Sequence, residues 1–162
     1  MGRGKTKRII IGDTLYRTFS IEEVEAVFAH ELGHQVHNDL WKEILFSSAL
    51  MYVSFFLADL LMGIFGPDGI KIAIHHPSVL FVFFITLFII HLPLGLLQVL
   101  FSRYCESQAD RFADEITGTG QKLADALERL TIQNRGEFCP WPILEFFTYS
   151  HPAPWKRILA LR

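Results

Sequence analysis

His30-Glu31-Leu32-Gly33-His34 is the stretch of this sequence that decides how the rest of the chain is read. It has the form H-E-x-x-H, and on a helix two residues four apart lie on one face, one above the other. Both imidazoles can therefore bind one metal ion, and zinc is the usual metal at such a pair. The glutamate between them is placed to take a proton from a water at the metal. The pattern predicts a zinc site carried by one helix.

The residues in front of this stretch predict that helix. Ser20-Ile21-Glu22-Glu23 has the form of a capping box, in which Ser20 and Glu23 each bond the other's backbone amide. Apolar residues then recur at helical spacing, namely Val24, Val27, Phe28 and Leu32. Gly33 is expected to leave room for close packing beside the metal. A surface helix with two unrelated histidines is the alternative.

Two histidines leave a catalytic zinc site one protein ligand short. The helix is predicted to run on past His37, so the third ligand has to come from elsewhere in the chain. Glu106 is the best candidate, because Glu106 and Asp110 share one face of another predicted helix. Glu106 would bind the metal, and Asp110 would accept a hydrogen bond from a ligand imidazole. On spacing alone, a solvated acidic face continued by Asp114 explains the same residues equally well.

Two long apolar runs account for much of the composition. The 162 residues are 51% hydrophobic with a mean hydropathy of +0.30, which is high for a soluble enzyme. The runs cover residues 43–65 and 79–101, and each is long enough to cross a hydrocarbon core of about 30 Å as a helix. The loop between them is rich in turn residues, so we predict a transmembrane hairpin. Two buried core helices are the alternative, although so short a chain has little mass left to cover both.

Basic residues predict the orientation of this hairpin. Lys42 precedes the first run, Arg103 follows the second, and four basic residues lie within 3–8, whereas the connecting loop has only Lys71. This bias places both ends of the hairpin and the H-E-x-x-H helix in the cytosol. We therefore expect a multi-pass integral membrane protein whose active site faces the cytosol and whose two cysteines are reduced.

Three further segments complete the reading of the chain. Residues 7–13 have a β-branched centre followed by a turn signal, which predicts a strand. The aromatic segment 138–149 is expected to line a substrate groove, to rest on the bilayer surface where Trp and Tyr are favoured, or to pack against the hairpin. After it, Ser150-His151-Pro152 leads into a short helix that contains Arg157.

These motifs, in this order, resemble the CAAX prenyl protease 1 and HtpX family of integral-membrane zinc metallopeptidases, which are gluzincins with H-E-x-x-H and a downstream E-x-x-x-D. The resemblance covers nearly the whole chain from Lys7. It implies that zinc is bound by His30, His34 and Glu106. It also implies that Glu31 is the general base, that Asp110 supports a ligand histidine, and that His151 and Arg157 line the active site. Family members carry further transmembrane helices ahead of the strand, and these are expected to be missing here, which leaves a flank of the hairpin uncovered and favours homo-oligomers.

We therefore expect a mainly α fold: a gluzincin-type zinc metalloprotease core with a short β element and a two-helix transmembrane hairpin. One metallopeptidase domain, 1–162, would hold the strand and H-E-x-x-H helix in 7–41, the hairpin in 43–101, and the Glu106 helix and C-terminal helices in 102–162. The expected function is that of a membrane-embedded zinc metalloendopeptidase, of CAAX-prenyl-protease or membrane-protein quality-control type. It would bind one Zn²⁺ per chain and act on a peptide or membrane-protein substrate in contact with the lipid bilayer, without a nucleic-acid partner.

Two other classes of protein would share these ligands. One is a catalytically inactive, zinc-containing membrane adaptor, and the other is a redox enzyme that holds iron on two histidines and a carboxylate. Glu31 favours the hydrolase, because a purely structural zinc site needs no base and usually has four protein ligands.

Overall fold

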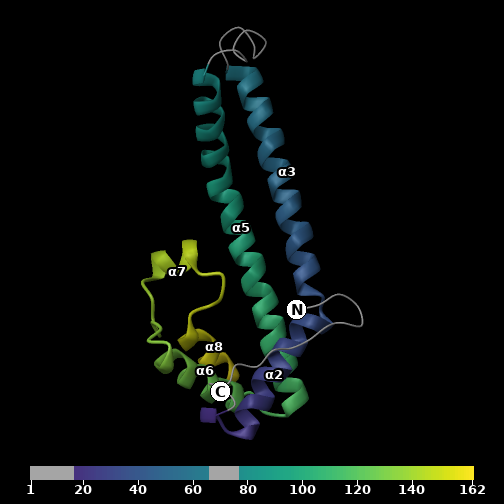
Figure 1. The fold of residues 1–162 in the computed structure, drawn as a ribbon, viewed down its shortest axis with the longest axis vertical. Helices are drawn as coiled ribbons and strands as arrows, with labels where there is room; N and C mark the ends of the chain where they lie inside the picture. Colours follow the sequence, from purple (N-terminus) through teal and green to yellow (C-terminus); the bar gives the residue numbers. More distant parts are fainter. Residues whose placement is uncertain (1–16, 66–76) are drawn as a thin grey trace. The chain divides into compact units, whose positions relative to one another are not determined.

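The computed structural model describes residues 17–65 and 77–162, and all regular secondary structure within those two ranges is helical (Figure 1). The helices, in chain order, are α2 (Ile21–Val36), α3 (Asp39–Phe65), α5 (Pro77–Thr117), α6 (Gln121–Gln133), α7 (Pro142–Thr148) and α8 (Pro154–Leu161). The mainly α fold is therefore confirmed. The strand predicted for residues 7–13 lies outside the described residues. The chain forms two compact units, one of residues 1–40 with 101–162 and the other of residues 41–100.

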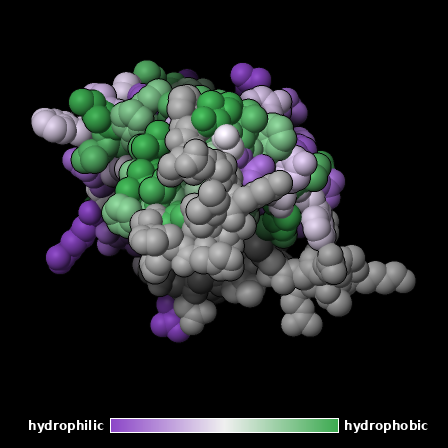
Figure 2. Space-filling view, turned by 90° about the horizontal axis from the view of Figure 1, so that it is seen from above, coloured by the Kyte–Doolittle hydropathy of each residue, from purple (hydrophilic) through white to green (hydrophobic). Residues whose placement is uncertain are grey.

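The unit of residues 41–100 is made of α3 and the first part of α5, which run side by side (Figure 1). Ser47 Oγ donates to Gln98 Oε1 at 3.1 Å, and the rings of Phe55 and Phe83 stack with their centroids 6.3 Å apart. Both helices are long and apolar enough to cross a membrane, and only 11% and 6% of their most apolar stretches are buried. The alternative of two buried core helices is therefore wrong, because exposed apolar side chains dominate this unit. Figure 2 shows hydrophobic residues over part of the face seen from above.

The other unit has a small core where α6 packs against α2 and α8. Its buried members are mostly small, which allows close contact between helices: Ala26, Ala29, Ala113 and Leu123, with Val27, Leu127 and Leu161 packed against them. The predicted capping box starts α2. Glu23 N donates to Ser20 Oγ at 3.2 Å, and Ser20 N donates to Glu23 Oε2 at 2.7 Å. Arg129 of α6 also reaches the buried Glu23 carboxylate at 3.2 Å, so this cap also connects α2 to α6.

Gly33 permits the closest approach between α2 and α5 in this unit. A Cβ atom at Gly33 would lie 3.0 Å from Ala109 Cα and 3.3 Å from Ala109 O. Any side chain there would push the helices apart, so the glycine and Ala109 set the separation of the two backbones. The expectation that Gly33 leaves room for close packing is confirmed, and its neighbour in that contact lies between Glu106 and Asp110 on α5.

The prediction that the first helix runs on past His37 is wrong. Helix α2 ends at Val36, Asn38 adopts a positive φ of 56°, and α3 begins at Asp39. Asparagine enters this left-handed region more readily than most residues, because its short polar side chain can bond locally. The bend has a consequence for the metal-ligand candidates, because it brings Asp39 back toward His34.

The close contact at Gly33 generates the first testable prediction. Gly33→Ala should destabilise the fold by about 1–3 kcal/mol, because the added methyl group overpacks the contact with the Ala109 backbone. Gly95→Ala is the matched control: Gly95 is also helical, and a Cβ there would meet nothing within 4 Å. That change should leave stability unchanged or raise it slightly, as Ala is the better helix former. Thermal unfolding in detergent measures both, and equal melting temperatures would contradict the close packing.

Candidate active site

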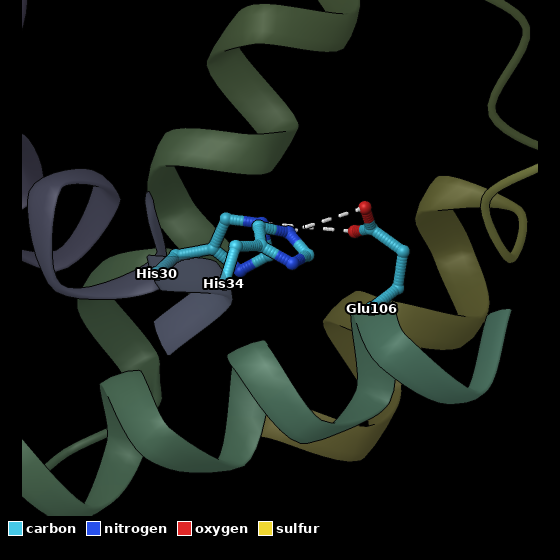
Figure 3. A group of neighbouring side chains, drawn as sticks. All are labelled: His30, His34 and Glu106. Atoms are coloured by element: carbon cyan, nitrogen blue, oxygen red, sulfur yellow. Dashed lines mark ion pairs between the residues drawn. The ribbon is translucent and has the colours of Figure 1, made fainter. Parts of the chain in front are cut away.

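Two helices bring the three predicted ligands together within one unit (Figure 3). His30 and His34 project from successive turns of α2, and their rings meet edge to face at a centroid distance of 4.8 Å. Across from them, α5 supplies Glu106, whose Oε2 lies 3.6 Å from His30 Nε2 and whose Oε1 lies 3.4 Å from His34 Nε2. One nitrogen from each histidine and one carboxylate oxygen lie within 4.8 Å of one another.

These residues fit a metal ion. Two ligand atoms bound at 2.0–2.2 Å to a tetrahedral zinc are about 3.4 Å apart, close to the observed separations between the imidazole nitrogens and the Glu106 oxygens. Oε2 of Glu106 is buried and receives no hydrogen bond from the residues that the structure describes. Its nearest charged neighbour is Arg157 Nη1 at 3.2 Å, and a cation between the three side chains would give this buried oxygen a direct partner. Two imidazoles and a carboxylate are a donor set that zinc accepts.

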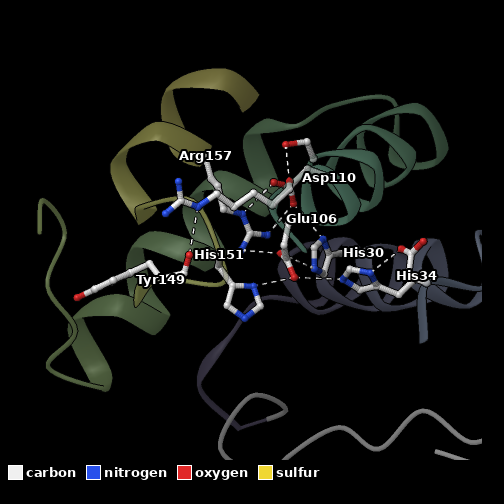
Figure 4. Close-up of polar contacts among 10 residues, drawn as sticks. His30, His34, Glu106, Asp110, Tyr149, His151 and Arg157 are labelled. Carbon is white, nitrogen blue, oxygen red and sulfur yellow. Dashed lines mark hydrogen bonds and ion pairs between the residues drawn. The ribbon is translucent and has the colours of Figure 1, made fainter. Parts of the chain in front are cut away.

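Each candidate ligand histidine has a carboxylate behind it (Figure 4). His30 Nδ1 lies 2.9 Å from Asp110 Oδ1, and His34 Nδ1 lies 2.9 Å from Asp39 Oδ2. Such contacts orient the rings and leave the Nε2 atoms for the metal. Asp110 was found from its spacing to Glu106, whereas the role of Asp39 was missed. The signal for Asp39 was local: Asn38 followed by an acidic helix start marks a chain reversal five residues after His34.

Arg157 joins the two carboxylates of α5. Its Nε and Nη2 donate to Asp110 at 2.8 and 2.7 Å, and its Nη1 lies 3.2 Å from Glu106 Oε2. The side chain is only 12% exposed, so the guanidinium is committed to these two anions. The fork geometry fixes Asp110 from one side while His30 contacts it from the other.

His151 also contacts Glu106, with Nδ1 2.7 Å from Oε1, but its side chain is 60% exposed. It therefore lies at the open edge of the cluster. Glu31 is exposed on α2 as well, directly after the buried His30. The structure thus brings His30, His34 and Glu106 together with Asp110, His151 and Arg157, and it leaves Glu31 and His151 open to solvent.

Contacts within the cluster shift the pKa values of its members. The hydrogen bond with the Glu106 carboxylate, helped by Asp39 and opposed by burial, raises the pKa of His34 to about 9. Burial acts to raise the pKa of Glu106, but contacts with His151 and His34 and the charge of Arg157 outweigh it and hold that pKa well below its usual range. A metal ion bound here would displace the proton from His34.

A second set of contacts holds the segment that carries His151. The carboxylate of Glu145 is buried, accepts from the Ala153 amide at 3.1 Å, and pairs with Lys156 Nζ at 2.9 Å through both oxygens. Arg103 of α5 donates to the Tyr149 carbonyl at 3.1 Å and to the Glu145 carbonyl. These contacts were also missed from the sequence. A lone acid within an apolar, aromatic segment was the available signal, because such an acid is rarely buried without a partner.

Comparisons with known proteins identify the family of this chain. The model of "Peptidase family M48" matches residues 1–162. CAAX prenyl protease 1 of Saccharomyces cerevisiae is 30% identical over 96% of this chain and 38% of its own length. Protease HtpX of Hahella chejuensis is 30% identical over 78% of this chain and 43% of its own length.

A solved structure, that of S. mikatae Ste24p, superposes with a TM-score of 0.72 at 29% identity, and the match covers 93% of this chain and 37% of that one. The chain thus spans about two fifths of the length of several relatives it matches. Because the family model covers the chain from end to end, and because the H-E-x-x-H helix and the Glu106 helix meet at one candidate metal site, this chain belongs to peptidase family M48.

Proposed function

We propose that this chain is the catalytic core of a membrane-embedded zinc metalloendopeptidase, folded as the single metallopeptidase domain expected from the sequence. The observation that carries the proposal is the candidate ligand set of His30, His34 and Glu106, in which a separate carboxylate contacts each histidine. Three protein ligands leave one position of a tetrahedral zinc open, as catalytic zinc sites require. When bound, the zinc ion would make a water nucleophilic near neutral pH and polarise the scissile carbonyl.

The exposed residues of the cluster would transfer protons and stabilise the negative charge that develops on the substrate. Glu31 takes the proton from the attacking water and delivers it to the leaving amine, and its exposure beside His30 is consistent with contact to substrate. His151 lies at the open edge of the cluster, where it can donate to the developing oxyanion. Arg157 is buried against Asp110 and Glu106, which favours a role in holding these carboxylates in place.

The two apolar helices would place this core at a membrane. We propose that α3 and the apolar part of α5 span the bilayer as a hairpin, with both ends and the active site in the cytosol, because basic residues flank the ends. The names of the matched relatives, CAAX prenyl protease 1 and Protease HtpX, support a peptide substrate. We propose that it is either a prenylated CAAX-type peptide or a membrane protein, as the resemblance to the family implies.

The metal site generates the second prediction. Glu106→Gln should abolish stable zinc binding, because it replaces one of three protein ligands. Asp110→Asn and Asp39→Asn should each weaken zinc binding by roughly 10- to 100-fold, as losses behind a ligand histidine do. Asp114→Asn, an exposed acid that continues the same acidic row, is the control and should bind zinc like the parent. Chelator competition measures the affinities, and parental zinc binding by Glu106→Gln would rule out this third ligand.

The third prediction separates catalysis from metal binding. Glu31→Gln removes the base but no metal ligand, so zinc content and melting temperature should match those of the parent. Peptide cleavage should fall by at least about 10²- to 10⁴-fold, the usual contribution of general acid–base catalysis. Glu25→Gln, an exposed acid on the same helix, should cleave at the parental rate. Full activity of Glu31→Gln would refute the mechanism, and an inactive, zinc-loaded parent would favour the adaptor.

The fourth prediction concerns topology. In a background where Cys105 and Cys139 are replaced by Ser, a single cysteine at Asp68 should react with an impermeant maleimide from the side opposite to a single cysteine at Arg3. The reason is that a hairpin puts its connecting loop and its two ends on different sides of the bilayer. Sealed and inverted vesicles distinguish the two sides, and labelling of both positions from one side would contradict the hairpin.

A further inference from the structure

Among the described residues of the unit that holds the metal-ligand candidates, α7 and the residue before it carry a run of exposed apolar side chains. Trp141, Ile143 and Phe147 are 73%, 67% and 60% exposed, and Leu144 and Phe146 extend the same surface. Single exposed apolar residues are common on soluble proteins, but a contiguous set of this size marks a contact with another molecule or a membrane. The proposed mechanism gives this surface no role.

The only charged side chain of α7 is turned away from this surface and neutralised. Glu145 is 4% exposed, and its carboxylate is bound by Lys156 and by the Ala153 amide, both on its inner side. The hydroxyl of Thr148 donates to the Leu144 carbonyl at 2.7 Å, so this polar side chain is also satisfied within the helix. The outward face of α7 therefore presents apolar side chains almost exclusively.

Part of the backbone of α7 is satisfied in the same way. A short helix normally leaves its last carbonyls to water. Here Arg103 donates to the carbonyls of Glu145, Phe146 and Tyr149, and the hydroxyl of Thr148 covers Leu144. At the other end, Pro142 has no amide hydrogen to satisfy. Internal satisfaction of backbone groups is what a lipid environment demands and a water-exposed helix does not need.

The position of Arg103 indicates that a lipid bilayer contacts the exposed apolar face of α7. It follows Phe101, the last residue of the apolar run of α5, by two positions. Arginine at the end of an apolar span lies at the headgroup level, and Trp and Tyr are enriched at the same level. By these bonds α7 is attached to Arg103, a residue that closely follows the apolar run of α5 in the chain, and Trp141 and Tyr149 flank the helix.

We infer that the outward face of α7 rests in the headgroup–acyl boundary of the bilayer that the hairpin spans, as an interfacial anchor too short to cross it. The inference relies on the membrane hairpin of the proposed function but not on its catalysis. Its consequence is that His151, two residues after Tyr149, is held close to the bilayer surface. Peptide bonds a short distance from the membrane would then reach the site most readily.

Tryptophan depth measurements test this anchor on the full chain in phosphatidylcholine vesicles. The variant Trp41→Phe/Trp155→Phe keeps Trp141 alone. Two reference variants place a single tryptophan on α5 in a background from which all native tryptophans have been removed. Phe88→Trp lies within the apolar run, and Ile116→Trp lies 13 residues, or about 20 Å along the helix, beyond Arg103. Trp141 should emit at shorter wavelength than Ile116→Trp, be quenched by acyl-brominated lipid, and resist iodide.

Three outcomes would overturn the anchor, and each points to a different cause. Iodide quenching of Trp141 as strong as that of Ile116→Trp, without lipid quenching, would show that the surface faces water. Protection from both quenchers would show that protein, such as a second copy of this chain, covers α7. Lipid quenching of neither Trp141 nor Phe88→Trp would overturn the membrane hairpin itself. A cleavage-inactive chain with quenched Trp141 would leave the anchor standing and contradict only the proposed catalysis.

Discussion

The structure of the metal-ligand unit depends on one buried carboxylate, that of Glu106. Four side chains contact it: His30 and His34 from α2, and His151 and Arg157 from the C-terminal segment. A buried anion is costly unless it is paired and hydrogen-bonded, so these contacts can persist only together. Arg157 supplies compensating positive charge at 3.2 Å, and a cation bound by the three ligand candidates would add to it.

Close packing between the backbones of α2 and α5 allows the histidines and carboxylates to meet. Gly33 lets α2 approach the turn of α5 between Glu106 and Asp110, so both the ligand carboxylate and its neighbour reach the histidines of α2. The bend at Asn38 provides the other carboxylate by bringing Asp39 to His34. The two histidines are therefore oriented by different elements, one by a neighbouring helix and one by the start of the following helix in the chain.

Features encoded within a few residues could be predicted from the sequence. The capping box at Ser20, the helix under His30 and His34, and the shared face of Glu106 and Asp110 all follow from local spacing, and the structure has each of them. The bend at Asn38 competed with a helical pattern that continues through it, and the positive φ was not evident from composition. The contacts of Glu145, Lys156 and Arg103 were missed because their partners lie 8 or more residues away, and only the folded chain shows which groups meet.

The contacts of Glu145 and Arg103 hold the C-terminal segment that carries His151. Lys156 and Arg157 are adjacent on α8, yet they bind different helices: Lys156 pairs with Glu145 of α7, while Arg157 pairs with Glu106 and Asp110 of α5. The chain between these anchors contains Ser150, His151 and Pro152. A displacement of α7 would therefore be transmitted to His151 through a short, doubly anchored loop rather than absorbed by a flexible one. If the outward face of α7 rests on the bilayer, the membrane itself becomes part of what positions His151.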